Sequence, residues 1–86
     1  MKLAILYHPD SEHAREVEDY AKEYGQKRSQ TVELVSLESR QGADMARLYD
    51  VVQYPAILVI KDDHALVKHW EGVPLPLMDE VASYSV

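Results

Sequence analysis

Apolar runs and amphipathic stretches alternate along the first half of this chain. Residues 3–7, Leu-Ala-Ile-Leu-Tyr, form an unbroken apolar run that predicts a strand buried on both faces. Residues 11–25 carry apolar side chains three or four positions apart among charged ones, which predicts a helix that ends at Gly25. Residues 31–38 combine β-branched and alternating apolar positions, which predicts a second strand.

The second half continues this alternation. Residues 42–51 have the spacing of a shorter helix, and residues 56–60 form another unbroken apolar run. Together with residues 64–71, that run predicts a β-hairpin, although its Asp-Asp turn lacks the glycine that tight hairpin turns favour. Pro76 predicts the first position of a final helix, because that position needs no N–H donor. Two apolar side chains of the second hairpin strand are expected to share a face: Leu66 and Trp70.

The order of these elements, β-α-β-α-β-β-α, predicts an α/β fold. A strand, helix, strand unit implies a right-handed crossover and a parallel pair, and the hairpin adds antiparallel strands. Neither an internal repeat nor a linker divides the chain. We therefore expect one domain over residues 1–86, built on a four-stranded mixed sheet flanked by helices.

Composition and charge exclude several classes of function. The 86 residues are 47% hydrophobic, which suits one compact core. The formal charge of −6 has the wrong sign for binding a phosphate backbone, so we expect no nucleic-acid partner. No apolar run reaches the ~18 residues of a membrane span, and the first run begins too early and is too short for a secretory signal. We therefore expect a cytoplasmic protein that does not bind membranes.

The chain contains no cysteine. Disulfides, thiolate metal sites and thiol redox chemistry are therefore all excluded. The four histidines are dispersed over the chain, and no pair has the i,i+4 helical spacing of a zinc motif, so we expect no metal and no cofactor. They are His8, His13, His64 and His69, of which His13 is expected to be a solvated residue of the first helical turn.

One internal segment resembles a known family. Residues 46–60, Ala-Arg-Leu-Tyr-Asp-Val-Val-Gln-Tyr-Pro-Ala-Ile-Leu-Val-Ile, are similar without a gap to the stretch of thioredoxins that carries their cis-proline. The following turn and strand, closed by Gly72, also resemble the C-terminal half of that family. The resemblance implies a minimal thioredoxin/glutaredoxin-like fold for the whole chain, with a cis peptide bond between Tyr54 and Pro55.

The junction of the first strand and the first helix resembles that of glutaredoxins. The family places a Cys-x-x-Cys motif there, and the resemblance puts Ser11 and Ala14 at the two cysteine positions. Since both sulfurs are absent, we predict no catalytic residue and no thiol-disulfide oxidoreductase activity. Asp10 or Ser11 is expected to cap the helix, because both residue types are preferred at that position.

The same resemblance implies a binding groove. In the family, the residue before the cis-proline offers its main-chain N–H and C=O to an extended peptide or to glutathione, in the manner of an added strand. Carried over, that residue is Tyr54, which we expect to be exposed. A plainer alternative is that Pro55 only shapes the turn into its strand. The resemblance places four more residues around this groove: Ser11, Ala14, Gly72 and Val73.

Three hypotheses of function remain open. In the first, the protein binds a protein or peptide partner through the cis-proline groove, which needs no catalytic residue. In the second, Ser11 at the helix N-terminus donates a hydrogen bond to the thiolate of glutathione or to another anion. In the third, the edge strand of residues 64–71, with only Lys68 and Glu71 as charges, pairs with its own copy to form a homodimer.

Overall fold

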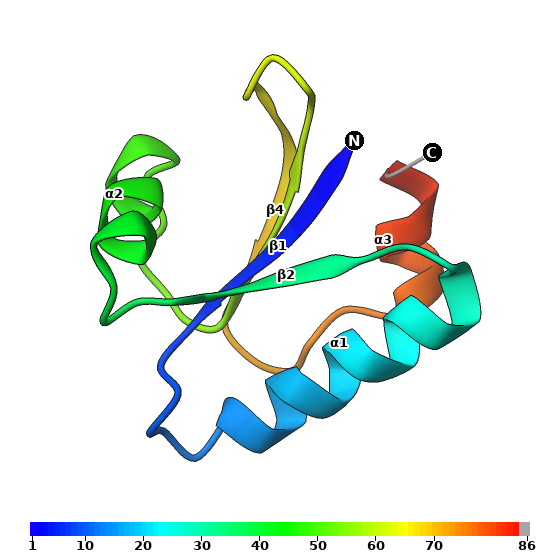
Figure 1. Ribbon diagram of the computed structural model, residues 1–86, viewed down its shortest axis with the longest axis horizontal. Helices are drawn as coiled ribbons and strands as arrows, with labels where there is room; N and C mark the ends of the chain where they lie inside the picture. The colour runs from blue at the N-terminus through cyan, green and yellow to red at the C-terminus, as the bar shows by residue number, and fades with distance from the viewer. Residues whose placement is uncertain (85–86) are drawn as a thin grey trace.

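The computed structural model describes residues 1–84 and has the predicted order of elements. Four strands and three helices follow one another as β-α-β-α-β-β-α (Figure 1). Their bounds are β1 Lys2–Tyr7, α1 Ala14–Arg28, β2 Val32–Ser36, α2 Arg40–Leu48, β3 Ala56–Ile60, β4 Leu66–Glu71 and α3 Met78–Tyr84.

The strands form one mixed sheet in the order β2-β1-β3-β4. β1 pairs in parallel with β2 and antiparallel with β3, and β4 pairs antiparallel with β3. Figure 1 shows α2 on one side of the sheet and α1 with α3 on the other. The α/β class and the four-stranded mixed sheet with helices on both faces are therefore confirmed.

Each face of the sheet has its own apolar core. β1 and β3 contribute to both cores, because successive side chains of a strand point to opposite faces. The first core joins β1 and β3 to α1 and α3, and it includes Leu3, Ile5, Val17, Tyr24, Ile57, Val59 and Val81. The second core joins the same strands to α2, and it includes Leu6, Val35, Ala46, Leu58 and Ile60. Burial of each large side chain contributes about 1.5–3 kcal/mol, so these strands hold both layers of helices.

Helix α1 differs from its predicted bounds at both ends. It begins at Ala14 rather than at residue 11, because residues 9–13 form turns and a bend before it. It also continues past Gly25 to Arg28. The left-handed position that ends the helix is occupied by Ser29, with φ 52°, so the prediction that Gly25 ends the helix is wrong.

The hairpin of β3 and β4 contains an irregularity that the sequence pattern did not predict. The register shifts between Val59 and Ile60, so that Val59 lies opposite Lys68 while Ile60 lies opposite Leu66. Such a bulge exchanges the faces of the residues on its two sides. Leu66 consequently packs into the core beneath α2, whereas Trp70 packs on the α1 and α3 face, and the expectation that they share a face is wrong.

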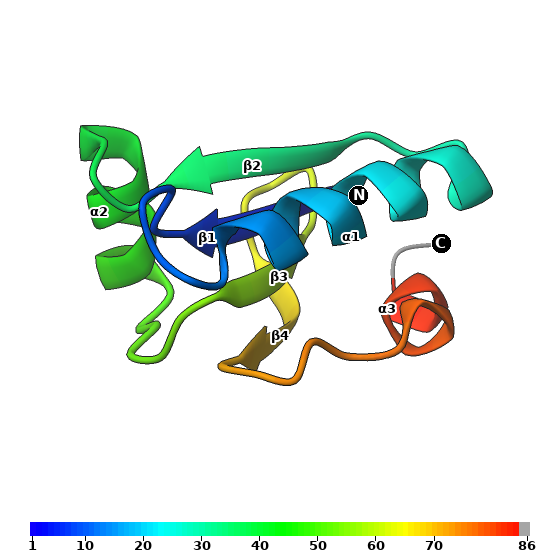
Figure 2. The ribbon, with the colours of Figure 1, turned by 90° about the horizontal axis from the view of Figure 1, so that it is seen from below.

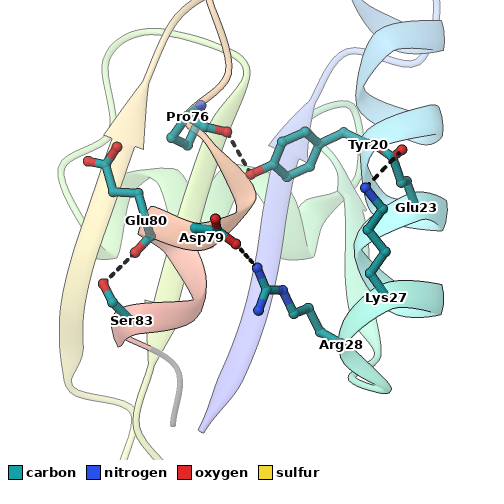
Figure 3. A network of polar contacts seen from close by, with 8 residues as sticks. All are labelled: Tyr20, Glu23, Lys27, Arg28, Pro76, Asp79, Glu80 and Ser83. Atoms are coloured by element: carbon teal, nitrogen blue, oxygen red, sulfur yellow. Dashed lines mark hydrogen bonds and ion pairs between the residues drawn. The ribbon is translucent and has the colours of Figure 1, made fainter.

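Helix α3 begins at Met78, two residues after the predicted Pro76. Pro76 instead lies in the approach to the helix, where its carbonyl accepts a hydrogen bond from the hydroxyl of Tyr20 at 2.9 Å (Figure 3). Partial burial raises the pKa of Tyr20 to about 12, which keeps this hydroxyl a donor. Arg28 also pairs with Asp79, so two contacts hold α3 against α1.

Helix α2 begins at Arg40, two residues before the predicted start. The hydroxyl of Ser39 caps it by accepting the Gly42 N–H at 3.0 Å. At Gly42 the helix approaches the end of β2 so closely that an added Cβ would overlap the carbonyl oxygen of Ser36. The absence of a side chain at this position sets the distance between α2 and the sheet.

We therefore predict that Gly42→Ala lowers the free energy of unfolding by about 1–3 kcal/mol, because the methyl group must displace the main chain. Gly25→Ala is the matched control, since its added Cβ comes no closer than 3.3 Å to the Gln30 carbonyl. Alanine favours helix while this contact is slightly tight, so the substitution is expected to change the value by less than about 1 kcal/mol in either direction. Denaturant unfolding measures both. Equal losses for the two variants would contradict this account of Gly42.

Candidate functional site

The predicted site residues come together at one end of the sheet. β1 ends where β3 begins, since Leu6 lies opposite Ala56 in the antiparallel pair. β4 ends at the same level, because Glu71 lies opposite Ala56. Figure 2 shows the loop after β1 and the segment before β3 at this common end. The topology therefore gathers the loop of Ser11, the Tyr54-Pro55 segment and the Gly72-Val73 loop.

The Tyr54-Pro55 peptide bond is cis, in agreement with the resemblance. A second cis bond, Val73-Pro74, lies in the loop after β4 and was not anticipated from the sequence. The carbonyl of Pro55 accepts the Gly72 N–H at 2.9 Å, which joins the two segments. Gly72 has φ 79°, a left-handed conformation that favours glycine, so the chain turns sharply away from β4 here.

Tyr54 is half-buried, and the expectation that it is exposed is wrong. Its hydroxyl donates to the Val51 carbonyl at 3.2 Å, and its ring meets the His8 ring edge-on, with the centroids 5.5 Å apart. Among residues 1–84, however, no hydrogen bond is made by its main-chain N–H or carbonyl. The exposed apolar surface is supplied by two neighbours instead, Val52 at 71% and Val73 at 62% exposure.

The junction of β1 and α1 is held by contacts that differ from the expected helix cap. Ser11 does not cap α1, because its hydroxyl donates to the His8 carbonyl at 2.6 Å. The N-cap position belongs to His13, which makes no side-chain cap, so the expected cap by Asp10 or Ser11 is wrong. His13 is also half-buried rather than solvated, since its Nε2 accepts the His8 N–H at 3.3 Å. The Ala14 N–H donates to the Ser11 carbonyl at 3.2 Å and closes a turn.

A shallow pocket of about 430 Å³ adjoins Tyr54 on its α2 side. It lies between the loop after β1 and helix α2, and its lining mixes apolar and charged side chains. Among the predicted site residues, Tyr54 borders it, whereas Ser11, Ala14, Gly72 and Val73 do not. The lining residues are His8, Leu37, Ala43, Ala46, Arg47, Asp50, Val51 and Tyr54.

Glu71 is a residue of this site that the sequence did not identify. One oxygen of its carboxylate, Oε1, accepts the main-chain N–H groups of Val52 and Gln53 at 2.6 and 3.0 Å. These two hydrogen bonds stabilise the charged form and lower the pKa of Glu71. The other oxygen lies 3.5 Å from His69 Nδ1, which has no hydrogen-bond partner among the described residues. Glu71 therefore ties the end of β4 to the segment that precedes Pro55.

Thiol chemistry is not available at this site. The chain has no cysteine, and the hydroxyl proton of Ser11 is already bonded to a carbonyl. Residues 1–84 contain no cluster of three or more potential metal ligands. Within the same residues no helix is long and apolar enough to cross a membrane. Among the described residues, the Tyr54 main chain has no hydrogen-bond partner, and Val52 and Val73 nearby expose apolar side chains.

Comparisons with known proteins show the fold. A thioredoxin 1 from the thermophilic eubacterium Thermosipho africanus TCF52B superimposes with a TM-score of 0.69, over 98% of this chain and 89% of that one. The two sequences are 10% identical. No protein-family model and no curated protein matches the sequence. The chain therefore has the thioredoxin-like fold, without the cysteines on which thiol-disulfide exchange depends.

We predict that Glu71→Ala lowers the free energy of unfolding by about 1–3 kcal/mol, because two main-chain donors lose a charged acceptor. Amide exchange at Val52 and Gln53 should accelerate, whereas exchange in β1 should change only with global stability. Glu33→Ala is the control, since that carboxylate pairs with Lys2 on the surface and should contribute little.

The contribution of Glu71 should also depend on pH. Its pKa is lower in the folded chain than the ordinary value of 4.5, so its stabilisation is complete above about pH 4.5. It is lost as the pH falls through the folded pKa. The difference in unfolding free energy between the wild type and Glu71→Gln should therefore shrink in acid, and a pH-independent difference would contradict the assignment.

The turn that precedes α1 leads to a third prediction. Four-residue turns bring their first and last Cα atoms within about 7 Å, which is near the range of a disulfide. The double substitution Ser11→Cys with Ala14→Cys should therefore form an intramolecular disulfide in air, measured by mass and thiol titration. Ser11→Cys alone should bridge only between molecules. A double variant that stays reduced, or that links only between molecules, would show that the two side chains do not face each other.

Proposed function

We propose that this protein is a redox-inactive binding module that holds an extended segment of a protein or peptide partner at Tyr54 and Pro55. The observation that carries this proposal is the main chain of Tyr54, whose N–H and carbonyl lack partners among the described residues. Val52 and Val73 flank it with exposed apolar side chains. An added strand satisfies the main-chain groups and covers the apolar ones together.

The supports of this segment favour binding without rearrangement. Glu71 holds the N–H groups of the two residues before Tyr54, and the Pro55 carbonyl is bonded to Gly72. A segment held in this way loses little conformational freedom when a partner binds, and preorganisation of this kind raises affinity. The partner supplies the two main-chain hydrogen bonds that the fold leaves open.

The side chains and the pocket around Tyr54 indicate which side chains a partner would place there. Alternate residues of an added strand point to opposite sides. Val52 and Val73 offer apolar contacts, and the pocket bordered by His8, Arg47 and Asp50 receives a side chain with polar groups. The proposed ligand is therefore an extended segment that alternates apolar and polar residues.

Glutathione or another anion at Ser11 is not favoured by the geometry. That hypothesis requires the Ser11 hydroxyl to donate to the ligand, but its proton is engaged by the His8 carbonyl at 2.6 Å. The formal charge of −6 also repels an anion at long range. Binding through the main chain of Tyr54 needs neither a free hydroxyl nor a cationic site.

We predict that a pool of extended peptides with alternating apolar and polar residues shifts the amide signals of Val52, Tyr54, Gly72 and Val73 in the labelled protein. Val52→Ser should weaken binding about fivefold, which corresponds to roughly 1 kcal/mol of lost apolar contact. Leu48→Ser is the matched control, because Leu48 is 70% exposed on α2, borders no part of the Tyr54 pocket, and should leave affinity unchanged.

Glutathione alone forms a second arm of this titration and should leave these signals unmoved. Signals that move with glutathione and not with peptides would replace the proposal by the anion hypothesis. Peptide-induced shifts that cluster away from Tyr54 would contradict the site, as would equal effects of the Val52 and Leu48 substitutions.

A further inference from the structure

β4 is an edge of the sheet, and the direction of its main-chain groups can be assigned. In an antiparallel pair, alternate residues direct their N–H and C=O toward the partner strand and away from it. The Gly72 N–H donates to the Pro55 carbonyl. The main-chain N–H and C=O groups of Trp70 and Lys68, two and four positions earlier, therefore also point toward β3. His69 and Glu71 between them direct their N–H and C=O outward, away from the sheet.

We propose that two copies of this chain pair antiparallel through β4, around a two-fold axis at Trp70, to form one continuous sheet. In this register His69 lies opposite Glu71 of the second copy, and Glu71 lies opposite its His69. Both are residues whose main-chain groups point outward, so each such pair exchanges two N–H···O=C bonds. The outward groups of the edge are thereby satisfied by an identical strand.

Side-chain complementarity selects this register. Residues directly opposite in a sheet lie on the same face, where the carboxylate of one residue can accept a hydrogen bond from the imidazole N–H of the other. The His69 side chain is 36% exposed and already lies near its own Glu71 carboxylate, at 3.5 Å. Pairing around Trp70 places a second carboxylate opposite each imidazole. Pairing around His69 would instead place imidazole opposite imidazole and Glu71 opposite Val67, with no such gain.

Residues 69–71 of β4 lack the features that usually prevent an edge strand from pairing, which are an outward lysine, a bulge or a proline. A lysine on an edge strand normally hinders pairing. Lys68, however, is drawn over the α3 face, where its Nζ lies 6.0 Å from the Trp70 ring centre and 5.7 Å from that of Tyr84. The bulge lies at the other end of the strand, opposite Val59 and Ile60, and β4 contains no proline. Residues 69–71 therefore form an open, self-complementary edge.

This proposal does not depend on peptide binding at Tyr54, and the two can fail separately. The test begins with the wild type, studied by sedimentation equilibrium and amide exchange at increasing concentration. We expect a dimer in which the His69 and Glu71 amides exchange about tenfold more slowly than in the monomer, as follows when nine-tenths of the chains are paired. Trp70 is the only tryptophan, so its fluorescence should change with the same midpoint.

Substituting proline for His69 removes only one hydrogen-bond donor, the outward main-chain N–H of that residue. His69→Pro deletes an N–H that makes no bond to β3, a position where edge strands tolerate proline, and it should yield a folded monomer. Leu34→Pro is the matched control on the opposite edge. The Leu37 N–H points inward to the Tyr7 carbonyl of β1, and N–H directions alternate along a strand, so the Leu34 N–H points outward, as that of His69 does. The Leu34→Pro variant should therefore stay dimeric.

Several results would overturn the proposal. They are a wild type that is monomeric at every concentration, a dimer whose His69 and Glu71 amides stay unprotected, or a His69→Pro variant as dimeric as the wild type. Loss of the dimer in Leu34→Pro with its retention in His69→Pro would move the interface to β2. If His69→Pro fails to fold, the amide exchange of the wild type decides the question by itself.

Discussion

The structure depends on two central strands that are apolar on both faces. All of β3 is buried, and so is β1 from Leu3 to Tyr7. A strand with one polar face needs cover on one side, whereas these two need cover on both. The chain meets that requirement by placing α1 and α3 on one face and α2 on the other. The layered architecture is thus a consequence of two short apolar segments.

The same constraint builds the site. With β1 and β3 antiparallel at the centre, the exit of β1, the entry to β3 and the end of β4 meet at one end of the sheet. Among the described strands, none pairs with the segment between α2 and β3, and one oxygen of the Glu71 carboxylate accepts two of its N–H groups. Tyr54 follows directly, and within residues 1–84 its main-chain N–H and carbonyl have no hydrogen-bond partner. The site therefore consists of the main chain at Tyr54 and the Glu71 carboxylate that holds the residues before it.

The sequence predicted those features that local pattern decides. The unbroken apolar runs marked β1 and β3, and the segment around Pro55 indicated both the fold and the cis bond. Features that depend on distant contacts were missed. Gly25 lies inside α1, because Ser29 takes the left-handed position, and Tyr54 is half-buried, because His8 packs against it. Glu71 carried no signal beyond being an acidic residue before a glycine.

The chain has no cysteine for thiol-disulfide exchange, and a fold alone does not determine function. Glu71 belongs to both of the proposed surfaces, the Tyr54 segment and the edge of β4. Its side chain orders the segment that leads to Tyr54, while its own N–H and C=O point outward along the edge of β4. In the proposed dimer its carboxylate also lies opposite His69 of the second copy, so a change to the carboxylate would affect both proposed surfaces, whereas loss of the His69 N–H would affect the edge alone. Substitutions at His69 and Val52 would consequently separate the proposed pairing between copies from the proposed partner binding at Tyr54.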